Sequence, residues 1–317
     1  MDKLVSILMP AYNAEKFIRQ AIDSILNQSY TNFELLIADD ASKDATKEII
    51  ESYTDKRIKT AHNVVNLGYL KTCNALIALA LGDYITFQDA DDWSDSLRIE
   101  KQIESFKQNS RIGLLGTFGY AVSANGEIRK LITKQHQDQE IRKVIPKYNQ
   151  FLSASRMITR EVYTSVGAYR LFFDRLGSED YDWVLRISEK YVVGNVAEPL
   201  YFYRQHNTSV SKVTKLKNHL SGKIAVFLSD QRKQHQGKDA LNSQELKIEL
   251  DSYIQELEAP YLKNTSLIYL EKAGEFLFFE MYKDCLKACF LAIKNNPLSV
   301  NNYRTLFYCV RKIIFKS

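Results

Sequence analysis

The first hundred residues alternate short apolar runs with amphipathic segments, and this alternation constrains the fold more than any other feature. Apolar or extended runs that read as strands span residues 5–9, 33–38, 57–62 and 83–88. Between them, apolar residues recur at helical spacing over residues 17–26, 46–53 and 71–81. Strands that alternate with helices in this way predict an α/β fold, in which helices cover both faces of a mainly parallel sheet.

Three of these strands end in polar residues. Pro10-Ala11-Tyr12-Asn13 follows the first strand, Asp39-Asp40 follows the second, and Asp89-Ala90-Asp91-Asp92 follows the run at 83–88. In open parallel sheets, ligands bind beyond the carboxyl ends of the strands, so these clusters are the main functional signal. No GxGxxG follows the first strand and no GxxxxGK[ST] loop occurs, which excludes the familiar dinucleotide fold and the Walker-type phosphate loop.

The acidic cluster Asp89, Asp91 and Asp92 is a candidate metal site. Carboxylates held close together repel one another and raise one another's pKa unless a cation compensates them. Hard oxygen ligands suit Mg²⁺ or Mn²⁺, and either ion can bridge to a substrate diphosphate. The alternative is a solvated turn whose acids favour the start of a helix from residue 96 onward. Because neighbouring strands also end in polar clusters, the metal interpretation is favoured.

Several motifs, in this order along the chain, resemble the family 2 glycosyltransferases with the GT-A fold. They are Pro10-Ala11-Tyr12-Asn13-Ala14-Glu15, Asp39-Asp40-Ala41-Ser42-Lys43-Asp44, Asn66-Leu67-Gly68, Asp89-Ala90-Asp91-Asp92, Glu179-Asp180-Tyr181-Asp182-Trp183 and Tyr203-Arg204-Gln205-His206. The resemblance ends near residue 211. It implies a GT-A catalytic domain over residues 1–211 and a metal-dependent, inverting glycosyltransferase that uses a nucleotide sugar.

The resemblance also implies roles for individual residues. Tyr12 stacks on the nucleotide base, Asp39 accepts a hydrogen bond from it, and a uracil N–H suits that carboxylate, so the expected donor is a UDP-sugar. Arg204 pairs with phosphate in fork geometry, and Lys71 lies near the diphosphate. The implied donor-binding residues are Pro10, Tyr12, Asp39, Asn66, Lys71, Asp89, Asp91, Glu179, Arg204 and Ser211, and the implied metal ligands are Asp91 and His206.

Glu179-Asp180 opens an amphipathic segment, and the resemblance makes Asp180 the general base toward an acceptor hydroxyl. A like charge at Glu179 and burial beneath the acceptor are expected to raise the pKa of Asp180 toward a useful value. The alternative is an acidic pair that simply favours the start of a helix. The order of the motifs favours the catalytic interpretation.

Residues 212–317 lack strand signals and predict an all-helical C-terminal domain. The pattern over residues 267–297 is similar to one tetratricopeptide repeat. From residue 285 to the end there are six basic residues and no acidic one. We interpret the final helix as core-facing with a solvated basic side. The alternatives are contact with an anionic membrane surface or with an acidic partner. Nucleic acid is not expected, because no binding motif accompanies the charge.

The expected function is transfer of a single sugar to a saccharide, lipid-linked or glycoprotein acceptor in surface glycan assembly. Single addition is favoured because Trp183 is preceded by Asp182, so the QxxRW motif of processive synthases is absent. The alternatives are a catalytically idle nucleotide-sugar-binding fold that recruits a partner, and a metal-dependent nucleotidyl or phosphoryl transferase. No apolar run of transmembrane length, no signal-peptide pattern and no CxxC spacing occur. We therefore expect a cytoplasmic protein, with peripheral association at the inner face of the membrane as the alternative.

Overall fold

The computed structural model describes residues 3–205 and 216–315. The chain divides into two compact units, Met1–His206 and Asn207–Ser317. The boundary predicted after residue 211 lies outside the described residues.

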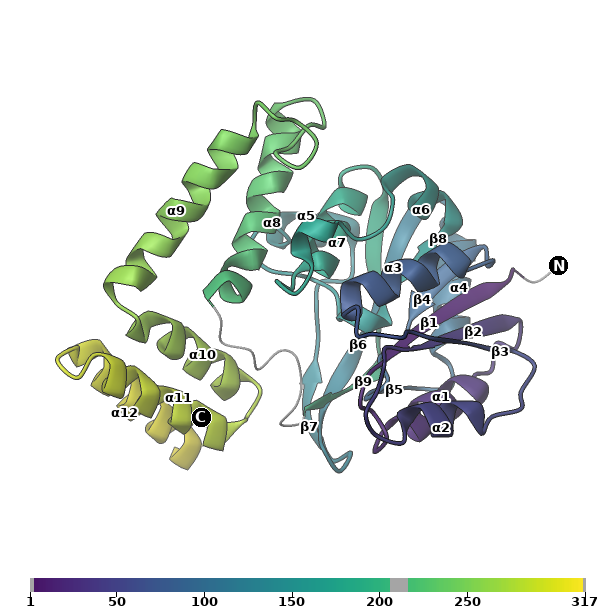
Figure 1. Cartoon of the computed structure of the whole chain (residues 1–317), viewed down its shortest axis with the longest axis horizontal. Coiled ribbons are helices and arrows are strands. Elements are labelled where there is room, and N and C mark those ends of the chain that lie inside the picture. The colour runs from purple at the N-terminus through teal and green to yellow at the C-terminus, as the bar shows by residue number, and fades with distance from the viewer. Residues whose placement is uncertain (1–2, 206–215, 316–317) are drawn as a thin grey trace. The chain divides into compact units, whose positions relative to one another are not determined.

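The first unit is built from nine strands and seven α-helices in its described part, with two short 3₁₀ turns (Figure 1). The strands are β1 (Val5–Ala11), β2 (Phe33–Asp39), β3 (Ile58–His62), β4 (Tyr84–Phe87), β5 (Trp93–Ser94), β6 (Ile112–Ser123), β7 (Ile128–Ile132), β8 (Met157–Thr159) and β9 (Val192–Gln205). The helices are α1 (Ile18–Leu26), α2 (Thr46–Glu51), α3 (Tyr69–Leu79), α4 (Arg98–Gln108), α5 (Asp138–Val144), α6 (Arg160–Val166) and α7 (Glu179–Ser188), and the turns are η1 (Ser153–Ser155) and η2 (Leu171–Phe173).

The strands form one sheet in the order β3-β2-β1-β4-β8-β6-β9-β5, and β7 pairs with β6. The α/β alternation predicted for the first hundred residues is confirmed, because β1 to β4 all run parallel to one another. Beyond β4 the sheet is mixed: β8 runs antiparallel to β4 and β6, whereas β6 and β9 are parallel. The sequence pattern did not reveal this second half.

Helices cover both faces of the parallel part of the sheet. The apolar stripes of α1, α2 and α4 pack on the face that carries Ile7, Met9 and Leu35. The helix α3 lies on the other face, where Figure 1 shows it on the opposite side of β1 to β3 from α1 and α2. Since β1 and β2 are buried along their whole length, apolar residues at successive positions suit both faces.

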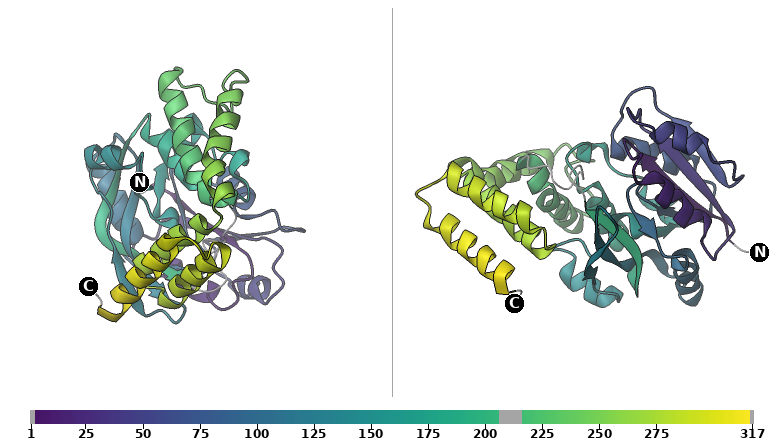
Figure 2. Two further views of the ribbon diagram at one scale, coloured as in Figure 1. Left: turned by 90° about the vertical axis from the view of Figure 1, so that its left-hand side faces the viewer. Right: turned by 90° about the horizontal axis from the view of Figure 1, so that it is seen from below.

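The described part of the second unit is all-helical, as predicted. It contains α8 (Leu216–Gln234), α9 (Lys247–Lys263), α10 (Ser266–Phe278), α11 (Tyr282–Asn295) and α12 (Val300–Phe315). The last two lie side by side in both views of Figure 2. Cys285, Cys289 and Cys309 meet as buried thiols in the core between α10, α11 and α12. Among the described residues, no helix is long and apolar enough to cross a membrane.

We expect Gly119→Ala to destabilise the first unit. A Cβ atom at Gly119 would lie 2.3 Å from the carbonyl oxygen of Tyr201 on β9, which is backbone and has little room to move. The expected loss is about 1–3 kcal/mol of unfolding free energy, seen as a lower Tm of the catalytic unit. Gly274→Ala is the matched control, because nothing lies within 4 Å of its Cβ position on α10. A lowered Tm in both variants, or in neither, would contradict the close approach of β6 and β9.

Candidate active site

The carboxyl ends of β1 and β2 place three of the expected residues, Pro10, Tyr12 and Asp39, along one edge of the sheet. Ala11 is in register with Asp39, and Asp39 with His62, so the three strand ends are adjacent. Tyr12 follows β1 and is 47% exposed, whereas Asp39 is buried. The Asp39 carboxylate accepts only long hydrogen bonds from the Ser42 amide, at 3.3 and 3.4 Å. An exposed aromatic ring thus lies beside a buried carboxylate with remaining acceptor capacity.

His62 is a residue that the sequence analysis did not single out. Its Nδ1 lies 4.0 Å from Oδ2 of Asp39, and its Nε2 lies 3.3 Å from Glu51. In the sequence, His62 is indicated only by its place as the last residue of a predicted strand, at the same edge of the sheet as the polar clusters. The parallel register is what brings it to Asp39.

Asn66 and Lys71 both contact the segment that precedes α7. Arg175 donates to the side-chain oxygen of Asn66 at 3.3 Å, and Lys71 forms an ion pair with Asp174 at 2.7 Å. The buried Asp40 shapes this region, because its carboxylate accepts the amides of Leu67 and Gly68 at 2.8 Å. Lys71 therefore already has an acidic partner, and its role toward a diphosphate stays a prediction.

The acidic turn after β4 brings three carboxylates together. Oxygen atoms of Asp89, Asp91 and Asp92 all lie within 4.8 Å of one another. Burial, followed by the neighbouring Asp91, raises the pKa of Asp89 to about 7, although Tyr69 donates a hydrogen bond to it. Burial, followed by the neighbouring Asp91 and Asp89, raises the pKa of Asp92 well above its ordinary value. The fold thus holds three acids together, and it disfavours the ionised forms of Asp89 and Asp92.

This donor set fits a divalent cation. Oδ1 of Asp92 accepts the Arg204 amide at 2.7 Å, but Oδ2 is buried without a hydrogen-bond partner in the part of the chain that the structure describes. A buried carboxylate oxygen without a partner is costly unless a ligand satisfies it. Hard carboxylate oxygens at this spacing are the ligands that Mg²⁺ and Mn²⁺ take.

Arg204 holds the acidic turn in place. Its guanidinium donates to the carbonyls of Asp91 and Ala124, at 2.7 and 2.8 Å, and lies between the rings of Phe17 and Trp93. Its side chain donates also to Gln20 at 2.6 Å, and the residue is 3% exposed. In this arrangement the guanidinium is engaged by the protein itself. Its predicted pairing with phosphate stays a prediction, and the structure gives it a positioning role.

The acidic pair opens α7, as expected from the sequence. The Asp180 carboxylate accepts the Tyr181 amide at 2.8 Å and the Asn149 side chain at 3.1 Å. Burial and the neighbouring Asp180 raise the pKa of Glu179 to about 7. Charge on Asp89 acts in the same direction on Glu179, so the acids of β4 and α7 influence one another despite their separation in sequence.

Arg156 lies between these two groups of acids, and the sequence analysis missed it. It is fully buried, donates to the Asp180 carbonyl at 2.9 Å and lies 3.9 Å from the Asp180 carboxylate. It also lowers the pKa of both Asp89 and Glu179 against the effect of burial. A single arginine in a polar stretch carries no sequence signal. Only the fold shows that it faces carboxylates from two distant segments.

The expected metal ligand His206 and the expected donor-binding residue Ser211 lie outside the described residues. Their roles stay predictions. The remaining expected residues lie at the carboxyl ends of β1, β2 and β4, between β3 and the first turn of α3, at the start of α7 and near the end of β9.

We expect the metal-free protein to lose stability as the pH rises. Asp89 and Glu179 have a pKa of about 7 in the folded chain and ordinary values near 4 when it unfolds, so the folded state binds more protons between these limits. The stability that these two groups contribute is therefore fully present below about pH 4, falls as the pH rises toward 7, and changes little above it. Thermal unfolding with chelator present, from pH 5 to 8, checks this prediction.

Asp89→Asn is the informative variant for this measurement. It removes one of the titrating groups, so its Tm should fall less steeply over the same pH range. Glu104→Gln, an exposed acid on α4, is the control and should follow the wild type. A Tm that rises from pH 5 to 7 in the wild type would contradict the raised pKa values.

Comparisons with known proteins agree with this geometry. Residues 6–172 match the family described as glycosyl transferase family 2. An uncharacterized glycosyltransferase of Haemophilus influenzae is 35% identical over 57% of this chain and 70% of its own length. WfgD of Escherichia coli, named UDP-Glc:alpha-D-GlcNAc-diphosphoundecaprenol beta-1,3-glucosyltransferase, is 36% identical over 42% of this chain and 53% of its own.

Among solved structures, S. aureus TarS 1–349 in complex with UDP-GlcNAc superposes with a TM-score of 0.60 at 17% identity. The match covers 98% of this chain and 88% of TarS 1–349. At this identity the likeness concerns the fold, and it confirms the GT-A architecture with a helical C-terminal region.

Proposed function

Because this chain belongs to glycosyl transferase family 2 and is a glycosyltransferase, we propose that its site transfers one sugar from a UDP-sugar to an acceptor hydroxyl, with inversion at the anomeric carbon. The observation that carries the proposal is the meeting of two acidic groups around Arg156: the turn after β4 and the first turn of α7. The first group suits the charged donor and the second suits a general base.

The donor end of the site supports UDP. Tyr12 offers an exposed ring on which a base can stack, and the adjacent Asp39 offers a carboxylate that can accept the uracil N–H. The relative WfgD is named for UDP-Glc, and TarS has been solved with UDP-GlcNAc. These names favour a UDP-sugar and leave Gal, Glc, GlcNAc and GalNAc as the donors to compare.

Asp89, Asp91 and Asp92 would hold the divalent cation; Asp89 and Asp91 are half-buried, whereas Asp92 is buried. A bound Mn²⁺ or Mg²⁺ would supply Lewis-acid stabilisation of the diphosphate charge. Arg204 and Tyr69 fix the turn that presents these carboxylates, through the Asp91 carbonyl and the Asp89 side chain.

Asp180 acts on the acceptor. The acceptor hydroxyl oxygen forms a bond to the anomeric carbon, its proton passes to the Asp180 carboxylate, and the bond from that carbon to the diphosphate breaks to release UDP. Asn149 and the Tyr181 amide orient the carboxylate for this task, and Arg156 holds the first turn of α7 in place. The contacts of these groups are consistent with the proposed role of each.

For the acceptor we propose a saccharide carried on a lipid diphosphate, in the assembly of a surface glycan. The support is the name of WfgD, whose acceptor is a GlcNAc-diphosphoundecaprenol. Single addition is proposed because Asp182 precedes Trp183, and in the structure that aspartate pairs with Arg170 and Arg186. A polysaccharide or a glycoprotein is the competing acceptor.

The test is UDP release from UDP-Glc, UDP-Gal, UDP-GlcNAc and UDP-GalNAc, with Mn²⁺ and with chelator. Slow attack by water should reveal the preferred donor without its acceptor. We expect metal-dependent release of UDP from one donor. This release should be lost in Asp91→Ala, because the acidic turn then lacks the Asp91 carboxylate.

Glu104→Ala is the matched control, since it removes an exposed acid of the same unit away from the site. Equal release with chelator would contradict the metal assignment. Silence across the panel, together with no measurable UDP binding, would overturn the UDP-sugar proposal and favour the idle fold. Binding of UDP with no release from any donor, in the presence of acceptor, would favour the nucleotidyl or phosphoryl transferase.

A further inference from the structure

The helix α12 exposes an aromatic and basic face that the chain's own core does not cover. Its inner side, with Asn302, Leu306 and Cys309, packs toward α10 and α11. Its outer face carries Tyr303, Arg304, Phe307, Tyr308, Arg311, Ile314 and Phe315, which recur every three or four residues. Phe307 is 71% exposed, Ile314 66% and Phe315 69%. The sequence analysis favoured a core-facing helix with a solvated side, and the exposed large apolar residues are the unexpected feature.

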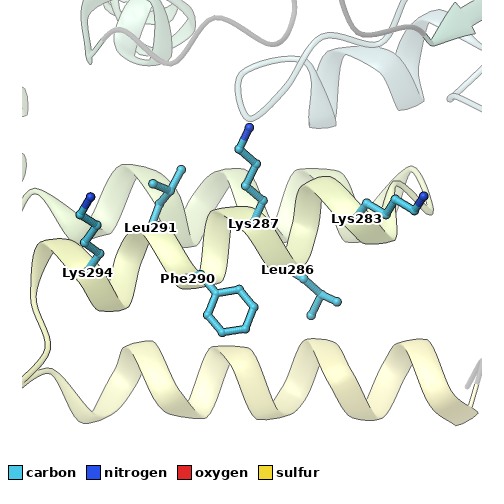
Figure 3. Close-up of a pocket in the computed structure, with 6 residues that line it drawn as sticks. All are labelled: Lys283, Leu286, Lys287, Phe290, Leu291 and Lys294. Carbon is cyan, nitrogen blue, oxygen red and sulfur yellow. The ribbon is translucent and has the colours of Figure 1, made fainter.

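A groove on the neighbouring helix has the same composition. It has a volume of about 490 Å³ and is lined by Lys283, Leu286, Lys287, Phe290, Leu291 and Lys294 of α11. The three lysines and Phe290, itself 60% exposed, recur at i, i+4, i+7 and i+11 and so form one stripe. Figure 3 shows the Phe290 ring directed toward α12. Apolar walls rimmed by ammonium groups suit an anionic head group with hydrocarbon beside it.

The charge of these helices decides which partner fits. Residues 282–315 contain six basic residues and one acidic residue, Asp284, so α11 and α12 carry an excess of positive charge. A second copy docked face to face on α12 would bring Arg304 and Arg311 against the same arginines, which is unfavourable. Exposed aromatic and apolar residues flanked by basic residues on the same helix are instead typical of helices that lie in the interface of an anionic bilayer.

We propose that α11 and α12 bind the enzyme peripherally to an anionic lipid surface, where the outer face of α12 inserts and the lysines of α11 contact head groups. The proposal deepens the proposed function, because a lipid-linked acceptor is presented at such a surface. The lipid binding itself does not depend on the transfer chemistry. The two can therefore fail separately.

The experiment is flotation of the full chain with vesicles of phosphatidylcholine alone and of phosphatidylcholine with phosphatidylglycerol. We expect binding to the anionic vesicles, weakened by salt, and little binding to the neutral ones. Each basic residue near such a surface raises the binding constant about fivefold, so Arg304→Gln with Arg311→Gln should weaken binding roughly 25-fold. Phe307→Ser with Ile314→Ser should also weaken binding strongly, because two of the exposed apolar side chains of the face are lost.

Ile248→Ser with Leu262→Ser is the matched control, because these α9 residues are equally exposed, at 74% and 70%, and lie on a helix with abundant acids. This variant should bind like the wild type. Metal-dependent UDP release in solution should be unchanged in every variant, which separates a failure of lipid binding from a failure of the sugar-transfer proposal.

Three outcomes would overturn the inference. The wild type could float equally with both vesicle types, it could float with neither, or the α12 variants could bind as well as the control. If the wild type proves dimeric in solution, does not float, and becomes monomeric on Phe307→Ser, the face belongs to a second copy instead.

Discussion

Asp180→Asn should lower kcat for sugar transfer by a factor on the order of 10³ while leaving UDP binding intact. The amide keeps the shape of the side chain, and its oxygen can still accept the Tyr181 amide, but it cannot take the acceptor's proton. The site would then bind its donor and fail at the step in which the acceptor oxygen attacks. Initial rates with donor and acceptor, alongside UDP binding by calorimetry, measure both quantities.

Glu189→Gln, an exposed acid at the end of the same helix, is the control and should keep full activity. An Asp180→Asn enzyme within tenfold of the wild type would exclude Asp180 as the general base. A matching loss of UDP binding would instead assign this residue to the donor. In the first case Glu179 becomes the candidate, because its raised pKa of about 7 already suits a proton acceptor near neutral pH.

Arg156→Met should destabilise the catalytic unit by about 3–5 kcal/mol, because it leaves buried carboxylates without their cation. The guanidinium also bonds Ser153, Tyr169 and the Asp180 carbonyl, and methionine supplies none of these donors. Thermal and urea unfolding measure the loss. The positive charge of Arg156 lowers the pKa of both Asp89 and Glu179, so the pKa of each should rise in this variant.

A purely structural arginine would lower stability and leave that titration in place. The pH profile of kcat/KM for the folded fraction is therefore the deciding readout, and its acid limb should shift to higher pH in Arg156→Met. Arg156→Lys keeps the charge and should restore most of the profile with only part of the stability. Arg111→Met, an exposed arginine just before β6, is the control for the loss of a cation. An unchanged profile in Arg156→Met would reduce Arg156 to a packing role.

The sequence predicted the parallel half of the sheet well. The strands that became β1, β2 and β4 are largely apolar runs followed or ended by polar residues, so each strand and the polar cluster at its end were visible. Asp39, Asp89 and Asp91 were singled out as candidate site residues for this reason. The acidic pair at Glu179 was also placed correctly at the start of a helix.

The second half of the sheet was not predicted, because its strands pair across long intervals of sequence. The strand β8 is three residues long and lies between β4 and β6, a position that no local pattern encodes. Gln231 to Gly237 is a polar stretch without a helical pattern of apolar residues, yet α8 continues to Gln234. Its Arg232 is buried against Asp239, an ion pair that polarity alone does not reveal.

What the sequence indicated by itself is a set of candidate groups: a ring and an acid proposed for a nucleotide base, three acids proposed for a cation, and an acidic pair proposed to accept a proton. These groups are read locally, from the residues that end a strand or begin a helix. The tertiary structure alone decided their electrostatics. Burial raised the pKa of Asp89 and Glu179, register brought His62 to Asp39, and the fold placed Arg156 between acids from distant segments. Desolvation and charge coupling depend on neighbours in space, and a linear sequence does not contain them.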